Sequence, residues 1–218
     1  MATVHVGDNT GEDYAGCEDS HLKSNATTTN YGTTTPLETG SWSVPDNLTY
    51  LVIKFSGLDS IPSALTVSAA TLYMYQSGND GTSINVLAKV LNRAWIEAQA
   101  TWNIWTTGNN WTTAGALHET NDRSATTTFD ISVNTTNEMK AFSTAQLISD
   151  VEDMADGTLG NYGWHLSLNT ASNTRYKQWI SSEGADGSRP YLSVTYTETA
   201  GGTNVSKYKK YYDYRRAQ

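Results

Sequence analysis

The sequence predicts an all-β protein, a β-sandwich of jelly-roll type with one short covering helix. Strong helix formers are scarce, whereas Thr, Ser, Asn, Gly and Tyr abound, and this composition favours strands and turns. Several short segments alternate apolar and polar residues, and only one segment repeats apolar residues at helical spacing. Short strands bury their apolar faces by packing as two layers, and 218 residues suit one such domain.

The alternation typical of half-buried strands recurs along the whole chain. In residues 50–55, for example, Leu51, Ile53 and Phe55 fall on one face. Asn79-Asp80-Gly81 is a strong turn signal between two such segments. The Trp-rich stretch 95–111 has no clear period, which predicts a long ordered loop, and residues 1–20 are acidic and turn-rich beyond a first strand. The predicted strands cover residues 3–6, 50–55, 67–75, 84–90, 126–133, 164–168 and 191–196.

The last two predicted strands are expected to close the sandwich as a hairpin-like pair. Trp164, Leu166 and Leu168 alternate with His165 and Ser167, which places the last two side chains toward solvent. Pro190 marks the start of the final strand, because proline cannot donate a ladder hydrogen bond within a sheet.

One helix is predicted shortly before this pair. Leu147, Ile148, Val151 and Met154 recur at helical spacing. Ser143 or Thr144 can cap its start and Asp156-Gly157 can end it. We expect its apolar stripe to cover an open end or edge of the sheets.

Charge divides the chain into two parts. The net charge of -8 argues against broad nucleic-acid binding, which needs cations to displace counterions from phosphates. Residues 198–218 carry five Lys or Arg and two acidic residues, a charge of +3, which leaves -11 on residues 1–197. We therefore predict a sandwich domain over residues 1–197 and a basic, Tyr-rich tail over residues 198–218.

Cysteine usage and the N-terminus bear on the compartment. Cys17 is the only cysteine, so no intrachain disulfide can form. The first residues show neither the basic region nor the apolar run of a secretory signal, and no stretch approaches membrane-spanning length. We expect a protein that is made and folded in a cytoplasm and does not contact a membrane.

Several blocks in a fixed order resemble a known family. The most specific is Trp95-Ile96-Glu97-Ala98-Gln99-Ala100-Thr101-Trp102-Asn103. The others are Thr29-Asn30-Tyr31-Gly32 with Leu37-Glu38-Thr39-Gly40, residues 51–62, Ala69 to Tyr75, Phe129-Asp130-Ile131, Asn161-Tyr162-Gly163, Ser181-Ser182-Glu183 and Arg189 to Tyr196.

Together these blocks, over about residues 25–197, resemble the DNRLRE-type domains, which are related to archaeal disaggregatase repeats and to some carbohydrate-binding modules. Lys54-Phe55-Ser56 stands where an Arg-Phe-Asp is common in that family. The resemblance implies a β-sandwich that attaches to surfaces or glycans and does no chemistry itself.

Aromatic rings beside amides are the main candidates for glycan contact. Apolar sugar faces stack on such rings, while amides bond the hydroxyls. The alternative is that the rings plug the core and hold long loops, and this is the interpretation adopted for Trp95, Trp102 and Trp164. The candidates are Trp105, Trp111, Asn109, Asn110, Tyr31 and Trp42.

Metal binding and catalysis have little support in the pattern. Asp8, Glu12 and Asp13 offer oxygens suited to Ca²⁺, but they lack EF-hand spacing and acidic turns are usually solvated. We expect no cofactor. No nucleophile elbow, phosphate loop or dinucleotide motif is present, so we predict a protein that is not an enzyme. Glu97 and Glu183 are expected to pin loops, and Arg189 is expected to pair with Glu183 or Asp186.

The tail alternates Tyr with Lys and Arg, residue types that are favoured at protein interfaces. We predict that it docks on another protein; the alternative is a disordered basic tail. The docking residues are Tyr208, Lys209, Lys210, Tyr211, Tyr212, Tyr214, Arg215 and Arg216.

Two classes of function are compatible with these features. The first is a structural and adhesive component of a bacteriophage virion surface, as head decoration, head fibre or tail fibre. Its tail would dock on neighbouring virion proteins, in a homo- or hetero-oligomer, and its loops would hold host-surface glycans. The second is an extracellular carbohydrate-binding module of a secreted polysaccharide-degrading enzyme.

Overall fold

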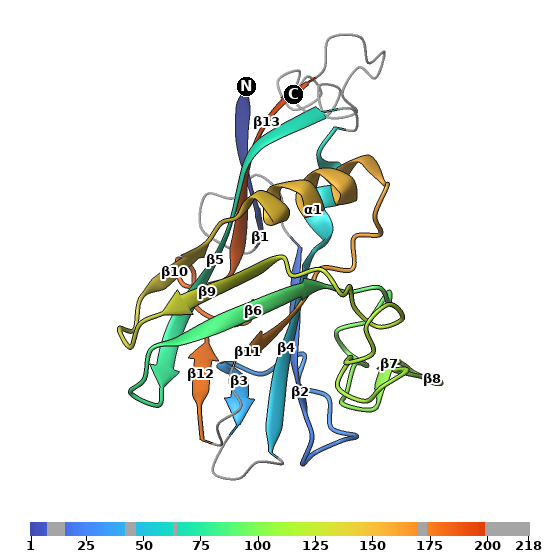
Figure 1. The fold of residues 1–218 in the computed structure, drawn as a ribbon, viewed down its shortest axis with the longest axis vertical. Coiled ribbons are helices and arrows are strands. Elements are labelled where there is room, and N and C mark those ends of the chain that lie inside the picture. The colour runs from blue at the N-terminus through green and yellow to red at the C-terminus, as the bar shows by residue number, and fades with distance from the viewer. Residues whose placement is uncertain (8–15, 42–46, 63–64, 170–173, 199–218) are drawn as a thin grey trace, which may run out of the picture.

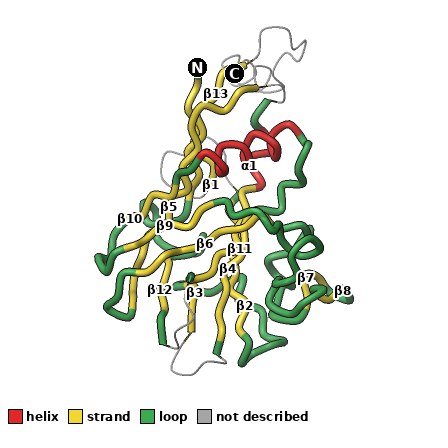
Figure 2. The backbone as a smooth tube through the Cα atoms, in the orientation of Figure 1, coloured by secondary structure: helices red, strands yellow, loops and turns green. Residues whose placement is uncertain are grey.

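The computed structural model of the protein describes residues 1–7, 16–41, 47–62, 65–169 and 174–198. Strands dominate it, and the described part contains one α-helix, α1 (Ala145–Asp156) (Figures 1 and 2). A large antiparallel sheet curls over on itself to form the sandwich. The predicted all-β sandwich with one short helix is therefore confirmed, whereas the jelly-roll subtype stays a prediction.

The strands are short except for one. In chain order they are β1 (Ala2–Gly7), β2 (Cys17–Lys23), β3 (Leu37–Ser41), β4 (Leu48–Phe55), β5 (Leu65–Asn79), β6 (Ile84–Val90), β7 (Ile104–Thr106), β8 (Asn109–Asn110), β9 (Phe129–Val133), β10 (Met139–Phe142), β11 (Trp164–Leu168), β12 (Tyr176–Trp179) and β13 (Tyr191–Glu198). A 3₁₀ turn, η1 (Ser56–Ser60), follows β4.

The sheet forms two layers that share β5. Its order is β1-β13-β5-β12-β3-β4-β11-β6-β9, with β10 on the other side of β5 and β2 on β4. Residues 65–73 of β5 pair with β13, whereas residues 76–79 pair with β12. We call β1, β13, β5 and β10 the first layer, and β2, β3, β4, β6, β9, β11 and β12 the second layer. Figure 1 shows β5 running the length of the sandwich.

The core lies between these layers. Leu72, Met74 and Val194 from the first layer share one cluster with Leu51 and Ile53 from the second. All five are fully buried or nearly so, and each such side chain stabilises the fold by about 1.5–3 kcal/mol relative to an exposed position. Aromatic rings contribute to the same core cluster, in which Phe129 and Phe142 stack with ring centroids 4.8 Å apart.

Helix α1 closes one end of the sandwich, as the sequence predicts. The Thr144 hydroxyl accepts a hydrogen bond from the Leu147 amide at 3.0 Å, and Gly157 ends the helix with a φ of 83°. Leu147, Val151 and Met154 are buried in the core cluster against β5 and η1.

The predicted closing pair is wrong. β11 pairs with β4 and β6, whereas β13 pairs with β1 and β5. Both strands are therefore interior strands, in different layers, and β12 lies between them in the chain. The solvent-facing placement of His165 and Ser167 is also wrong, because they are only 1% and 7% exposed.

A second hydrophobic cluster explains this burial. It lies on the outer face of the second layer, beneath the segment 91–128, and Val52 and Leu22 reach it because alternate residues of a strand point to opposite faces. The predicted long ordered loop is confirmed, apart from the small β7–β8 pair. The buried members of the second cluster are Leu22, Val52, Leu91, Trp95, Ala100, Trp111 and Ala116.

The buried carboxylate of Asp122 organises the segment that covers this cluster. Its two oxygens accept hydrogen bonds from the amides of Thr112 at 2.9 Å and Thr113 at 2.8 Å. Loop amides that no ladder satisfies are thereby paired within the protein. A segment without regular structure can in this way cover a sheet face.

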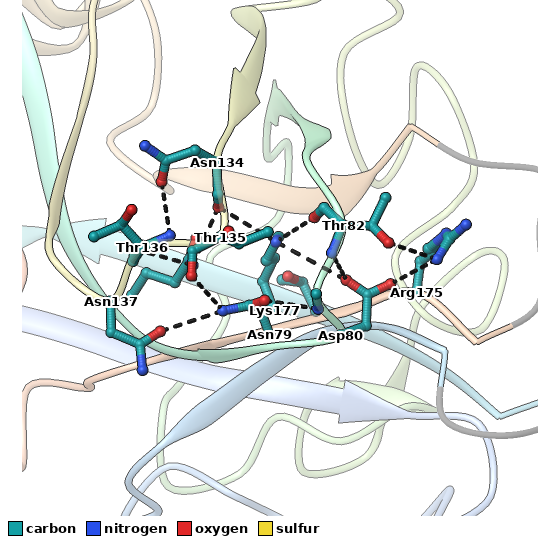
Figure 3. A network of polar contacts seen from close by, with 12 residues as sticks. Asn79, Asp80, Thr82, Asn134, Thr135, Thr136, Asn137, Arg175 and Lys177 are labelled. Atoms are coloured by element: carbon teal, nitrogen blue, oxygen red, sulfur yellow. Dashed lines mark hydrogen bonds and ion pairs between the residues drawn. The ribbon is translucent and has the colours of Figure 1, made fainter.

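A polar network joins the turn between β5 and β6 to β12 and to residues 134–137 (Figure 3). The fully buried Lys177 donates from Nζ to the Thr82 carbonyl at 2.7 Å and lies 4.0 Å from Asp80 Oδ1. Arg175 Nη1 lies 3.3 Å from Asp80 Oδ2 and donates to the Thr82 hydroxyl at 2.7 Å. Burial lowers the pKa of Lys177, and the nearby Asp80 opposes that effect.

The two cations on Asp80 differ in burial, which gives a matched pair of variants. Lys177→Met should lower the free energy of unfolding by about 3 kcal/mol, because it leaves the Thr82 carbonyl without its donor and removes a buried cation 4.0 Å from the Asp80 carboxylate. Arg175→Met should lower it by less than about 1 kcal/mol, because that side chain is 36% exposed. Urea denaturation measures both, and equal losses would contradict the stabilising role of Lys177.

Candidate binding site

A hollow of about 320 Å³ lies where the segment 101–114 meets the loop between β2 and β3. Both segments are at the right and lower side of Figure 1. Uncharged residues line it: Thr28, Thr101, Asn103, Ile104, Asn110, Trp111 and Ala114. We call it the first hollow.

Trp111 forms the floor of the first hollow. It is 4% exposed and belongs to the second cluster, and its indole Nε1 donates to the Thr101 carbonyl at 2.9 Å. Its backbone amide donates to the Asn103 carbonyl at 3.0 Å. The ring is thus fixed in place, and with so little surface exposed it cannot offer its face for stacking on a sugar.

Thr101 holds the wall of the hollow in a tight turn. Its hydroxyl accepts from the amides of Asn103 at 3.2 Å and Ile104 at 3.3 Å, and its own amide donates to the Ile104 carbonyl at 2.9 Å. The Asn103 amide also donates to the Thr27 carbonyl at 3.2 Å, which ties the wall to the facing loop. Both sides of the hollow are therefore preorganised.

The polar groups of the hollow are open to a ligand. Within the described part of the chain, the side-chain amides of Asn103 and Asn110 and the hydroxyl of Thr28 make no hydrogen bond. Each amide offers two donors and an acceptor, which suits vicinal hydroxyl groups. Ile104 and Ala114 add apolar contact. The arrangement suits an uncharged, hydroxyl-rich ligand.

The other predicted glycan residues lie in different places. Trp105 is half-buried and packs against the second cluster, outside the lining of the hollow. Asn109 is exposed and donates from Nδ2 to the Thr107 carbonyl at 3.4 Å. Tyr31 packs on His21, with ring centroids 4.4 Å apart, and lies under the Lys23 ammonium. Trp42 lies outside the described residues.

The calcium and docking candidates also lie outside the described residues: Asp8, Glu12 and Asp13, and the tail residues Tyr208, Lys209, Lys210, Tyr211, Tyr212, Tyr214, Arg215 and Arg216. Among the residues that are described, no group of three or more His, Cys, Asp or Glu side chains is arranged to hold a metal ion. No helix in the described ranges is long and apolar enough to cross a membrane.

Glu97 pins loops, as predicted. Its Oε1 accepts from the Asp19 amide at 2.8 Å, and its carbonyl accepts from Asn30 Nδ2 at 2.6 Å. The carboxylate of Asp19 accepts in turn from the Ser182 amide at 2.8 Å. Burial raises the pKa of Glu97 to about 7 and that of Asp19 well above its usual range. Three of the blocks that carry the family resemblance meet here, which no local pattern indicates.

The predicted pairing of Arg189 is confirmed with one of its two candidates. Arg189 Nη1 lies 3.0 Å from Asp186 Oδ1, and both side chains are partly or largely exposed. An exposed pair of this kind contributes little to stability.

No protein-family model matches this chain, and no curated protein matches it. The resemblance to DNRLRE-type domains therefore stays a prediction. The candidate site is therefore defined only by its lining residues and their hydrogen bonds.

His165 lies on the outer face of the second layer, where it contacts the segment 91–128. Its Nδ1 lies 3.1 Å from Arg123 Nη1 and its Nε2 lies 3.2 Å from the Gly115 carbonyl. Burial, with Arg123 nearby, lowers the pKa of His165 to about 3. A cation is thus disfavoured there, so Nδ1 accepts from Arg123 and Nε2 donates to Gly115.

This histidine should make the fold sensitive to acid. An unfolded histidine titrates near pH 6.5, so between about pH 6.5 and pH 3 only the unfolded state binds the proton, and stability falls as pH falls. The loss is about 1.4 kcal/mol per pH unit. His165→Gln should be less stable at pH 7.5 but should lose about 2 kcal/mol less than the wild type on moving to pH 5.

Denaturant titrations at both pH values test this expectation. Asp19 and Glu97 act in the opposite direction, because their raised pKa values favour the folded state as pH falls. The quantity to measure is therefore the difference in unfolding free energy between the variant and the wild type at each pH. Parallel pH profiles for the two proteins would contradict a neutral, buried His165.

Proposed function

We propose that this protein is a non-catalytic adhesive β-sandwich that binds an uncharged glycan in the first hollow. The observation that carries the proposal is the lining of that hollow. The amides of Asn103 and Asn110 and the hydroxyl of Thr28 surround an apolar floor and are not committed to other described residues.

The charge and rigidity of the site support this ligand class. No charged side chain lines the first hollow, although the chain carries 36 acidic or basic residues in total. A neutral, hydroxyl-rich ligand is therefore favoured over a phosphate or a peptide with charged groups. Because the walls are held by hydrogen bonds in the free protein, binding loses little conformational entropy.

We place this adhesive protein on a bacteriophage virion surface. The domain is rich in Thr and Asn and carries a net charge of -11, and its tail has the opposite charge; both features support that setting. A carbohydrate-binding module of a secreted polysaccharide-degrading enzyme would use the same hollow. Catalytic domains in the same reading frame would favour the module.

Two amide substitutions test the glycan site. Asn103→Ala with Asn110→Ala should weaken binding to the glycan that gives the strongest array signal by about tenfold or more, which corresponds to about 1.4 kcal/mol. Asn109→Ala is the matched control, because that exposed amide lies outside the hollow and should leave binding unchanged. Equal signals from the double variant and the wild type would exclude the hollow.

The tail is proposed to attach the domain to its neighbour. The tail follows β13, which is hydrogen-bonded on both sides, to β1 and to β5. A load on the tail would therefore enter an interior strand of the first layer. This position supports a role as an anchor.

Removing residues 199–218 tests the anchor and leaves β13 complete. The truncated protein should keep its unfolding midpoint and no longer sediment with particles assembled in its presence. A second variant, with Tyr208, Tyr211, Tyr212 and Tyr214 changed to Ser, keeps the tail's charge and should also fail to associate. Normal association of the truncated protein would refute the anchoring role.

A further inference from the structure

A second hollow, of about 190 Å³, lies where the end of β2 and the loop after it meet β3 and the start of β4. All of its lining residues are polar: Lys23, Asn25, Glu38, Asn47 and Thr49. None of them was singled out as a glycan contact from the sequence.

The two hollows lie on opposite sides of the β2–β4 pair. Thr49 and Lys23 face each other across that pair, on the face that Leu51 and Ile53 turn toward the main core. Trp111, the floor of the first hollow, packs with Val52 and Leu22 on the other face. A ligand that reached both hollows would therefore pass over the end of these strands.

The loop 24–30 contributes to both hollows, and we call it the ridge; it belongs to the blue connection below β2 at the lower right of Figure 1. Asn25 lines the second hollow and Thr28 lines the first. Three residues span at most about 11 Å of chain. Turns that join the Ala26 amide to the Lys23 carbonyl and the Thr29 amide to the Ala26 carbonyl shorten this further. The hollows are thus within reach of one short oligosaccharide.

This ridge is held in place along its length. Ser24 Oγ accepts from the Leu48 amide at 2.8 Å, and the Ser24 amide donates to the Leu48 carbonyl at 2.9 Å. At the other end, Asn30 Nδ2 donates to the carbonyls of Glu97 at 2.6 Å and Ala100 at 2.8 Å. A fixed ridge keeps the two hollows at a constant separation.

The second hollow has no unbalanced charge. Lys23 Nζ lies 2.7 Å from Glu38 Oε2, so its one cation and its one anion neutralise each other. The Glu38 amide donates to His21 Nδ1 at 2.9 Å, which fixes the start of β3 beside the hollow. Tyr31, an aromatic glycan candidate in the same connection, lies under the Lys23 ammonium, 5.3 Å from it. The amide, hydroxyl and carboxylate groups of the second hollow suit sugar hydroxyls, as the amides and hydroxyl of the first hollow do.

We infer that the two hollows are subsites for one uncharged oligosaccharide that lies across the loop 24–30. The inference rests on the proposed glycan-binding function and extends it to a ligand of several linked sugars. Once one sugar occupies the first hollow, the next part of the chain is held beside the second at a high effective concentration, so affinity rises with chain length.

The test uses full-length protein and soluble oligosaccharides of glucose, galactose or N-acetylglucosamine, from one to six units, with titration calorimetry as the readout. For the series that binds, wild-type affinity should rise at least tenfold from the shortest bound fragment to the longest. Asn25→Ala combined with Thr49→Val should abolish this rise and leave the affinity for the shortest fragment unchanged. Thr29→Ala, an exposed change in the same loop outside both hollows, is the matched control.

The outcomes separate the two proposals. If the Asn25 and Thr49 variant keeps the full rise with length while the Asn103 and Asn110 variant loses binding, the second subsite is excluded and the first hollow stands. If wild-type protein binds none of the three series at any length, both proposals fall. Thr49 is buried, so the double variant can be unstable, and Asn25→Ala alone then serves as the second variant. If affinity rises with oligosaccharide length in Asn25→Ala as it does in the wild type, the inference is overturned.

Discussion

The centre of the second layer, at β4 and β11, is buried on both faces, and the rest of the structure depends on that constraint. β4 sends Leu51 and Ile53 into the main core and Val52 into the second cluster, and all five residues of β11 are buried. A sheet of this kind needs a cover on each side, and the first layer with α1 supplies only one. The segment 91–128 supplies the other. Most residues that line the first hollow belong to this segment, so the candidate site forms where the segment covers the outer face of the second layer.

Double burial also determines the electrostatics. His21 and His165 occupy positions that alternation would assign to solvent, and burial lowers the pKa of each to about 3. The pKa values of the buried Asp19 and the half-buried Glu97 shift in the opposite direction, because desolvation raises the pKa of a carboxyl group. The second layer and the segment that covers it therefore contain histidines that stay neutral and carboxyl groups that protonate more readily than usual. Each is held by hydrogen bonds to backbone groups, which is how polar side chains remain tolerable away from water.

Sequence patterns predict the regular parts of this fold and fail where polar residues are buried. The helix was predicted with its cap and its end because Thr144, Val151 and Gly157 act locally. β2, β10 and β12 were not predicted, because Asp19, Lys140 and Lys177 occupy buried positions in them that a polar side chain would not suggest. The prediction that β11 and β13 pair was wrong because the alternation of apolar and polar residues indicates which side chains of a strand are buried, but not which strands it pairs with. At the site, Asn110 and Trp111 were identified together, whereas Thr28 and Asn103 were not, since only the folded chain brings the loop after β2 to the segment after Trp102.

The strand β5 belongs to both layers, and this has a mechanical consequence. Its fifteen residues bond to β13 in one layer and to β12 in the other, so neither layer can detach while the other stays intact. We therefore expect the two layers to unfold together in one cooperative step and not one after the other. A pull along β13 would stress its row of hydrogen bonds to β5 in shear, where they resist together, and β5 would carry the tension to its far end, which bonds to β12. A load applied at the C-terminal end of β13 would in this way be transmitted through both layers along a single continuous strand.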